Sequence, residues 1–146
     1  SLAQAGLGHS LALQDRFEPA EVEIQEALAV RRLGYGDRHP LIAEGLRQLG
    51  RLRSREGRLA EAEDLLRQAF EMHAPFYDCP LVSRTEAEWA SVLLALGENR
   101  AASAHAVAAL RRLERIGLAA HPFSRLAREV SASADLGEAH EQLGQL

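Results

Sequence analysis

The sequence contains no lysine and only one cysteine. All 17 of its basic residues are arginine, which is explained either by codon bias in a GC-rich bacterial genome or by selection for recognition through planar guanidinium groups. Cys79 has no second cysteine with which to form an internal disulfide. The low cysteine content therefore predicts a reducing, cytoplasmic location.

Long apolar runs and an excess of one charge are also missing. No stretch approaches the length of a membrane span, and the first residues lack the basic flank and apolar run of a signal peptide. The formal net charge is only −4, so nothing global attracts the chain to nucleic acid or to an anionic membrane. Because the sequence has no initiator methionine, we expect it to be a piece of a longer protein.

What the sequence does contain is a near-repeat. The tripeptide at 15–17 is echoed at 57–59, which is 42 residues later, and a fixed period of this size indicates stacked supersecondary units. Prolines that begin the first helix of each new unit follow at similar intervals, at Pro40, Pro80 and Pro122. The apolar positions echoed at the 42-residue interval are Ala20, Ile24, Ala27 and Leu28, which correspond to Ala62, Leu66, Ala69 and Phe70.

Apolar residues at steps of three and four predict helices almost throughout, and strand signals are essentially absent. In the middle unit two helices are joined by the short polar stretch 55–58, where Gly57 suits the end of a helix. Such a pair forms an antiparallel hairpin. The predicted helices cover residues 2 to 13, 17 to 32, 41 to 55, 59 to 73, 81 to 96, 99 to 116, 123 to 134 and 137 to 145.

The small and large apolar residues of each hairpin resemble the tetratricopeptide repeat. The resemblance implies an all-α fold, an α-solenoid in which antiparallel helical hairpins stack into a right-handed superhelix. The connector at 33–40 is more particularly similar to the kinesin light chain type of this repeat, which has repeats of about 42 residues and is widespread in bacterial multidomain proteins. The matching positions are Leu7, Gly8, Leu11, Ala20, Ile24 and Ala27; Leu46, Leu49, Gly50, Gly57, Ala62, Leu66 and Ala69; and Trp89, Ala90, Leu93, Gly97, Ala102, Ala106 and Ala109.

We expect one tetratricopeptide-like domain over residues 1–146. Its hairpins cover about 1–39, 40–79 and 80–121, and a degenerate hairpin at 122–146 caps the stack. The second connector is two residues shorter than the first and carries Phe76 and Tyr77, which either fill the junction or form a contact patch.

The candidate ligand site lies on the first helix of each hairpin, because these helices line the concave face of such a stack. In the middle unit Arg47, Arg51 and Arg55 are four residues apart and form a stripe beside Gln48. Guanidinium groups bind carboxylates bidentately, so the stripe predicts an acidic partner peptide. The alternative is a solvated helix face on which the arginines pair with neighbouring glutamates. Other hairpins would add Arg84, His9 and Ser91 to the peptide-binding surface.

Cofactor, metal and catalytic sites are not expected. Among the six histidines, only a weak grouping of His73 with Asp78 and Cys79 approaches the spacing of a zinc site. There is no glycine-rich phosphate loop, and no serine, histidine and aspartate arrangement has motif support. His39 and His121 each precede a proline and suit the start of a helix, while His105 is expected on a helix surface and Trp89 in the core.

The sequence therefore predicts a non-enzymatic scaffold module that binds a partner protein or peptide in its concave groove. Two alternatives remain open. One is a structural module that self-associates into a homodimer, and the other is an accessory or sensor domain of a larger signalling enzyme.

Overall fold

The computed structural model describes residues 17–36, 38–74 and 79–145, and over these ranges it contains six α-helices and no strand. Neighbouring helices pack consecutively, which confirms the all-α helical-repeat class. The chain divides into two compact units, Ser1–Phe76 and Tyr77–Leu146, and each is described by itself. None of the helices in the described ranges is both long and apolar enough to cross a lipid bilayer.

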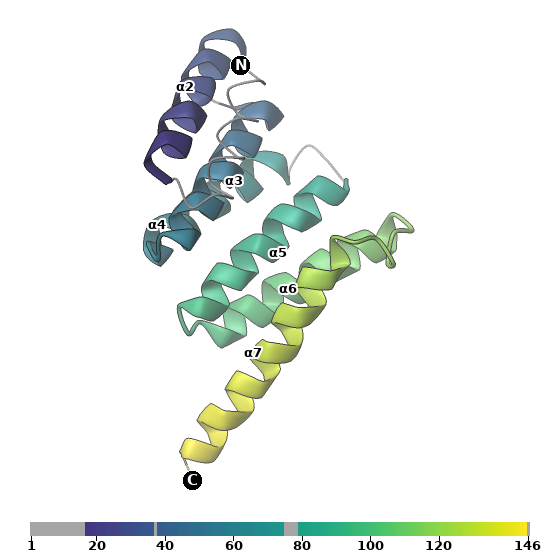
Figure 1. The fold of residues 1–146 in the computed structure, drawn as a ribbon. Coiled ribbons are helices and arrows are strands. Elements are labelled where there is room, and N and C mark those ends of the chain that lie inside the picture. Colours follow the sequence, from purple (N-terminus) through teal and green to yellow (C-terminus); the bar gives the residue numbers. More distant parts are fainter. Residues whose placement is uncertain (1–16, 37, 75–78, 146) are drawn as a thin grey trace. The chain divides into compact units, whose positions relative to one another are not determined.

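The first unit contains α2 (Phe17–Tyr35), α3 (Pro40–Arg55) and α4 (Leu59–His73), with α3 packed against both of the others (Figure 1). Pro40 occupies the first turn of α3, where its missing N–H costs nothing. His39 caps this helix, because its Nδ1 accepts a hydrogen bond from the backbone N–H of Leu41 at 3.1 Å. The predicted role of His39 at a helix start is therefore confirmed. After α3, Gly57 adopts a φ of 79° and turns the chain into α4, as a helix-ending glycine does.

In the core of the first unit, α3 comes very close to α4 at Gly50 and to α2 at Gly45. A Cβ atom placed on Gly50 would lie 2.8 Å from Cγ of Leu66 in α4, and one placed on Gly45 would lie 2.7 Å from Cγ of Leu28 in α2. Neither distance leaves room for a methyl group. The two glycines therefore let α3 approach α2 and α4 closely enough to bury the surrounding apolar side chains, which are Ala20, Ile24, Leu28, Ile42, Ala43, Leu46, Leu49, Leu52 and Ala69.

The second unit contains α5 (Pro80–Ala95), α6 (Asn99–Arg115) and α7 (Ser124–Gly144), and each of these helices contacts the other two (Figure 1). One alanine from each helix meets in the centre: Ala87, Ala109 and Ala127. Trp89 is buried in this unit, as predicted. Pro80 begins α5 and Gly97, at φ 83°, follows it, so this hairpin repeats the α3–α4 hairpin at an interval of 40 residues.

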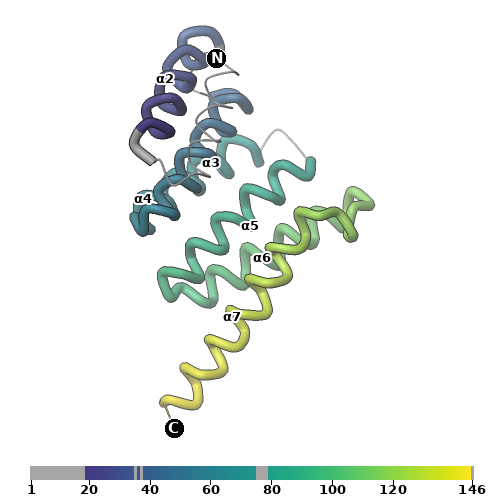
Figure 2. Tube along the Cα trace, in the orientation of Figure 1, coloured from purple at the N-terminus to yellow at the C-terminus, as the bar shows by residue number. Residues whose placement is uncertain are grey.

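The two short helices predicted over 123 to 134 and 137 to 145 are wrong. The chain instead forms the single helix α7, whose trace runs without a break in Figure 2. Gly137 lies inside this helix, where an added Cβ would come within 2.7 Å of the Asn99 amide of α6. Asn99 also donates a hydrogen bond to Glu141 at 2.9 Å, and Ser103 donates one to Asp135 at 3.2 Å. Contacts with α6 thus hold the second half of α7 in a continuous helix, so 122–146 contains no hairpin turn at 135–136.

The positions of the remaining helix ends agree with the sequence pattern to within a few residues. The stretch 75–78, with Phe76 and Tyr77, and the helix predicted over 2 to 13 lie outside the described residues. The grouping of all hairpins into one domain stays a prediction.

We predict that Gly50→Ala destabilises the protein. Overpacking against Leu66, which is fully buried, costs about 1–3 kcal/mol and outweighs the roughly 1 kcal/mol that alanine adds in helix propensity. Gly34→Ala is the matched control, because Gly34 is also helical but a Cβ there would meet nothing within 4 Å. Urea unfolding followed by circular dichroism should show a lower midpoint for Gly50→Ala and an unchanged or higher one for Gly34→Ala. Equal midpoints would contradict the packing argument.

Candidate functional site

The polar face of α3, defined as Gln48, Arg51 and Arg55, is the part of the predicted peptide site that the structure brings together. Successive residues advance by about 100° around a helix, so these three point to the side opposite Ile42 and Leu49 in the core. Arg55 is exposed, whereas Gln48 and Arg51 are half-buried. The side-chain oxygen of Gln48 is buried and accepts no hydrogen bond from any residue in the described ranges.

Arg47 does not belong to this face, although it was predicted to. A step of four residues overshoots a full turn by about 40°, so Arg47 lies well round the helix from Arg55. It is only 4% exposed. Its Nη2 and Nε donate hydrogen bonds to the Glu44 carboxylate at 2.7 and 3.1 Å. Pairing with Glu44 is one part of the alternative interpretation of the stripe, but that interpretation placed the arginines on a solvated face, whereas Arg47 is buried.

A buried arginine on the side of α3 away from the polar face fastens α2 to α3. Arg53 donates two hydrogen bonds to the Glu21 carboxylate at 2.5 and 2.6 Å and one to Glu56 at 3.0 Å. Its Nε also forms an ion pair with the Glu61 carboxylate at 3.2 Å. Hydrogen bonding to Arg53 lowers the pKa of Glu21 below its ordinary value, and the same bonds raise the pKa of Arg53. The bidentate pair therefore stays ionised and fixes the position of α3 relative to α2.

The other predicted site residues lie elsewhere. Arg84 and Ser91 are on α5 in the second unit, and both are half-buried. The guanidinium of Arg84 lies 5.1 Å from the centre of the Phe123 ring, a cation–π distance. His9 falls outside the described residues, so its predicted role is untested.

Sequence reasoning missed a buried polar cluster in the second unit. Glu86 of α5 is 2% exposed and accepts hydrogen bonds from Arg112 at 2.6 Å and from His105 at 2.9 Å, both on α6. The His105 ring also stacks on Trp89, with 4.0 Å between centroids. His105 is therefore a helix–helix contact, and its prediction as a plain surface residue is wrong. The available signal was that Glu86 occupies the place that core Leu46 has 40 residues earlier.

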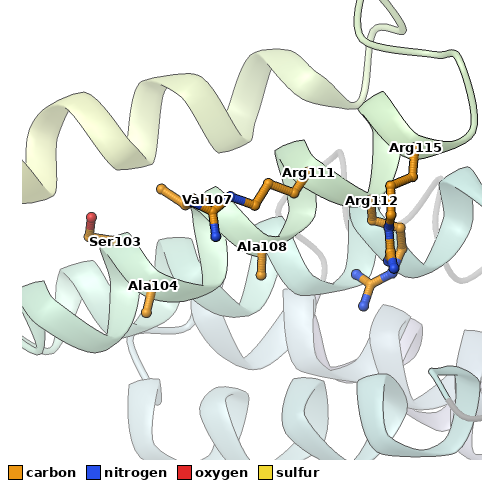
Figure 3. Close-up of a pocket in the computed structure, with 7 residues that line it drawn as sticks. All are labelled: Ser103, Ala104, Val107, Ala108, Arg111, Arg112 and Arg115. Carbon is orange, nitrogen blue, oxygen red and sulfur yellow. The ribbon is translucent and has the colours of Figure 1, made fainter.

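Sequence reasoning also missed a groove on α6. Its volume is about 580 Å³, and Figure 3 shows its lining side chains. Three of them are arginines near the C-terminal end of the helix, and none is acidic. The signal in the sequence was the basic cluster at 111, 112 and 115. The lining residues are Ser103, Ala104, Val107, Ala108, Arg111, Arg112 and Arg115.

Metal ligands do not gather anywhere in the described ranges. There, no three histidine, cysteine, aspartate or glutamate side chains lie close enough together to hold an ion. His121 instead accepts a hydrogen bond from the backbone N–H of Phe123 at 3.2 Å, which fits its predicted place before a helix. The arrangement of polar groups on α3 and α6 is suited to binding through charge and hydrogen bonds.

Helices that pack on their sequence neighbours within each unit define the class of α-helical repeat proteins. Within this class, the tetratricopeptide repeat family matches residues 1–74. The chain belongs to this family, a non-catalytic repeat module that generally mediates protein–protein interaction. No curated protein matches the chain.

The pairing of Glu21 with Arg53 predicts an acid-sensitive fold. Because the pKa of Glu21 is lower in the folded protein than its ordinary value of 4.5, the unfolded chain binds the extra proton. The stabilisation is complete above pH 4.5 and is lost as the pH falls through the lower, folded-state pKa. Glu21→Gln should reduce the free energy of unfolding by roughly 1–2 kcal/mol at neutral pH and flatten its decline in acid.

This pH dependence is measured by urea unfolding at a series of pH values. Glu23→Gln is the control, because Glu23 lies on the same helix and outside the Arg53 cluster. If the free energy of unfolding of Glu21→Gln falls with decreasing pH as steeply as that of the unaltered chain, the Glu21–Arg53 pair does not cause the acid sensitivity.

Proposed function

We propose that this chain is a protein-interaction module in which the polar face of α3 binds an acidic segment of a partner protein. The supporting observation is that Gln48, Arg51 and Arg55 share one side of α3, where the Glu44 carboxylate is already bound by Arg47, while the other sides of the helix are used for packing. We place the module in a larger bacterial protein of the cytoplasm, and we assign its repeats to the kinesin light chain-like subtype on the connector at 33–40.

The chemistry of this face favours carboxylates. Each guanidinium presents a planar fork of N–H donors that matches the two oxygens of a carboxylate, which a lysine ammonium cannot do. Arg51 and Arg55 are one helical turn apart, about 6 Å along the axis. This interval suits two acidic side chains of a ligand segment, either on one face of a helix or alternating along an extended chain.

Gln48 would add a polar contact beside the two arginines. Leaving its buried oxygen without a donor is costly, and turning the amide toward a bound segment would let that oxygen accept a backbone N–H. Binding of a partner would therefore form a new hydrogen bond and also remove the free-energy cost of leaving the Gln48 oxygen buried without a donor.

The rigidity of the surrounding unit supports the same function. Arg53 pins α3 to α2 through Glu21, and Arg47 is held by Glu44, so the backbone that carries the polar face is fixed before a ligand arrives. Preorganisation of this kind reduces the entropy lost on binding.

Reversing the two charges should test this proposal directly. We expect Arg51→Glu combined with Arg55→Glu to weaken binding of a fluorescein-labelled polyglutamate peptide by about tenfold or more, because each carboxylate loses a charge-assisted partner worth about 1.5–3 kcal/mol. Fluorescence anisotropy at low salt measures the affinity. Arg47 is left unchanged, since it is buried and paired.

The control is Arg32→Glu combined with Arg38→Glu, which changes the net charge equally at two exposed positions away from the polar face. Circular dichroism confirms that both variants are folded. If both pairs weaken binding equally, the peptide responds to net charge alone and the proposed face is rejected.

A second candidate function is self-association, and α7 favours it. Leu136 and Leu143 are seven residues apart, so they share one side of the helix, and they are 64% and 66% exposed. Large apolar side chains exposed together are typical of contact surfaces. We expect sedimentation to show a dimer that Leu136→Glu with Leu143→Glu converts to a monomer. Leu33→Glu with Leu96→Glu serves as the control, and a concentration-independent monomer would rule this function out.

A further inference from the structure

Two sides of α6 are used for packing in the second unit. His105 and Arg112 reach Glu86 on α5, and Ser103 and Asn99 contact α7. The buried residues of α6 point between these two neighbours. The outer face, comprising Ala104, Val107, Ala108, Arg111 and Arg115, points away from them and forms the groove of about 580 Å³.

The groove has an apolar half and a cationic half. Its floor consists of the short side chains of Ala104, Val107 and Ala108, which let another chain approach the helix closely. In Figure 3, the Arg111 side chain extends back along α6 toward Val107, and Arg115 projects from the last turn. Along the helix, over about 18 Å, the lining residues change from small and apolar to basic, while the Arg111 guanidinium reaches back beside Val107.

The charges of the groove are not balanced within it. Arg112 is held by the buried Glu86, but the exposed Arg111 makes no hydrogen bond or ion pair with any residue in the described ranges. Elsewhere in this unit Arg125 pairs with Glu129 on its own helix. Arginines near a helix C-terminus also complement the helix dipole, but this effect does not account for the apolar floor beside them.

We propose that this groove is a second docking surface, distinct from the polar face of α3, for an acidic segment of a partner protein that also carries aliphatic side chains. The aliphatic groups lie on Ala104, Val107 and Ala108, and the carboxylates bind Arg111 and Arg115. Charge complementarity selects the acidic partner, since the lining contains three arginines and no carboxylate. About five extended residues span the length of the groove.

The test uses the full chain and a short fluorescein-labelled peptide in which leucines alternate with glutamates. Arg111→Glu combined with Arg115→Glu should weaken its binding by more than about tenfold, and Arg111→Gln alone should weaken it severalfold. The same peptide with glutamine in place of glutamate should bind poorly, and added salt should reduce the affinity of the glutamate peptide.

Two control variants test whether binding is specific to the groove. Arg100→Glu combined with Arg125→Glu changes the net charge equally at two exposed positions outside the groove, and it should preserve binding. The variant with Arg51→Glu and Arg55→Glu alters only the polar face of α3, which is itself proposed to bind acidic segments, and the binding that depends on Arg111 and Arg115 should persist in it. Circular dichroism verifies folding, and the milder Arg111→Gln variant serves if the double reversal does not fold.

The outcomes are distinguishable. Loss of binding confined to the Arg111 and Arg115 variants supports the groove. Loss of binding in the α3 variant alone overturns the groove while leaving the proposed function of α3 intact. Equal loss in the Arg111 with Arg115 variant and in the Arg100 with Arg125 variant indicates unspecific charge attraction and also overturns the groove. Absence of binding by the unaltered chain, or a dimer that the Arg111 and Arg115 changes convert to a monomer, also overturns the proposal.

Discussion

The first unit depends on the absence of side chains at two positions of α3. Gly45 faces Leu28 of α2, and Gly50 faces Leu66 of α4, each at a distance that excludes even a methyl group. Only with glycine at both places can one helix lie closely against two neighbours and bury apolar surface on both sides. This double packing uses up most of the circumference of α3 and leaves a single polar strip, which carries the candidate site. In the second unit three alanines, one from each helix, provide the same close approach.

Both hairpins bury charged side chains, and Arg53 and Glu86 do so at different positions of the repeat. Arg53 occupies the position that corresponds to the buried Leu93, while Glu86 occupies the position of the buried Leu46. Burying a charge is unfavourable unless it is paired and hydrogen-bonded. Arg53 is satisfied by glutamates of three different segments and Glu86 by two groups of α6. These pairings tie particular helices to particular neighbours, so the repeated hairpins are not interchangeable.

The exclusive use of arginine has structural consequences whatever its genomic origin. Arg53 binds both oxygens of Glu21 and reaches Glu56 and Glu61 as well, which requires several donors in a planar fork. A lysine could not satisfy this geometry. In the described part of the chain many arginines are used in such internal pairs. Arg55 on the polar face of α3 and Arg111 in the groove of α6 are instead exposed, and both surfaces are proposed to bind carboxylates.

Local chemistry made much of the fold predictable from the sequence. Apolar spacing located the helices, proline and histidine marked the start of α3, and Gly57 marked its end, because each acts through its immediate neighbours along the chain. The break predicted near 135 was wrong because α7 is kept continuous by contacts with Asn99 and Ser103 of another helix. Arg47 was placed on the exposed face because residues four apart were treated as aligned, whereas each such step turns about 40° around the helix. Which residues at the edge of that face are buried depends on the neighbouring helices.

The sequence by itself thus determined most of the helices, the caps of α3 and the repeat family, because these depend on short-range patterns of residue size and hydrophobicity. Only the tertiary structure decided which charges are buried. Glu86, His105 and Arg112 are separated by up to 26 residues and meet because α5 and α6 fold back on each other. The same packing decided which arginines remain at the surface, because burial depends on neighbours that are distant in sequence.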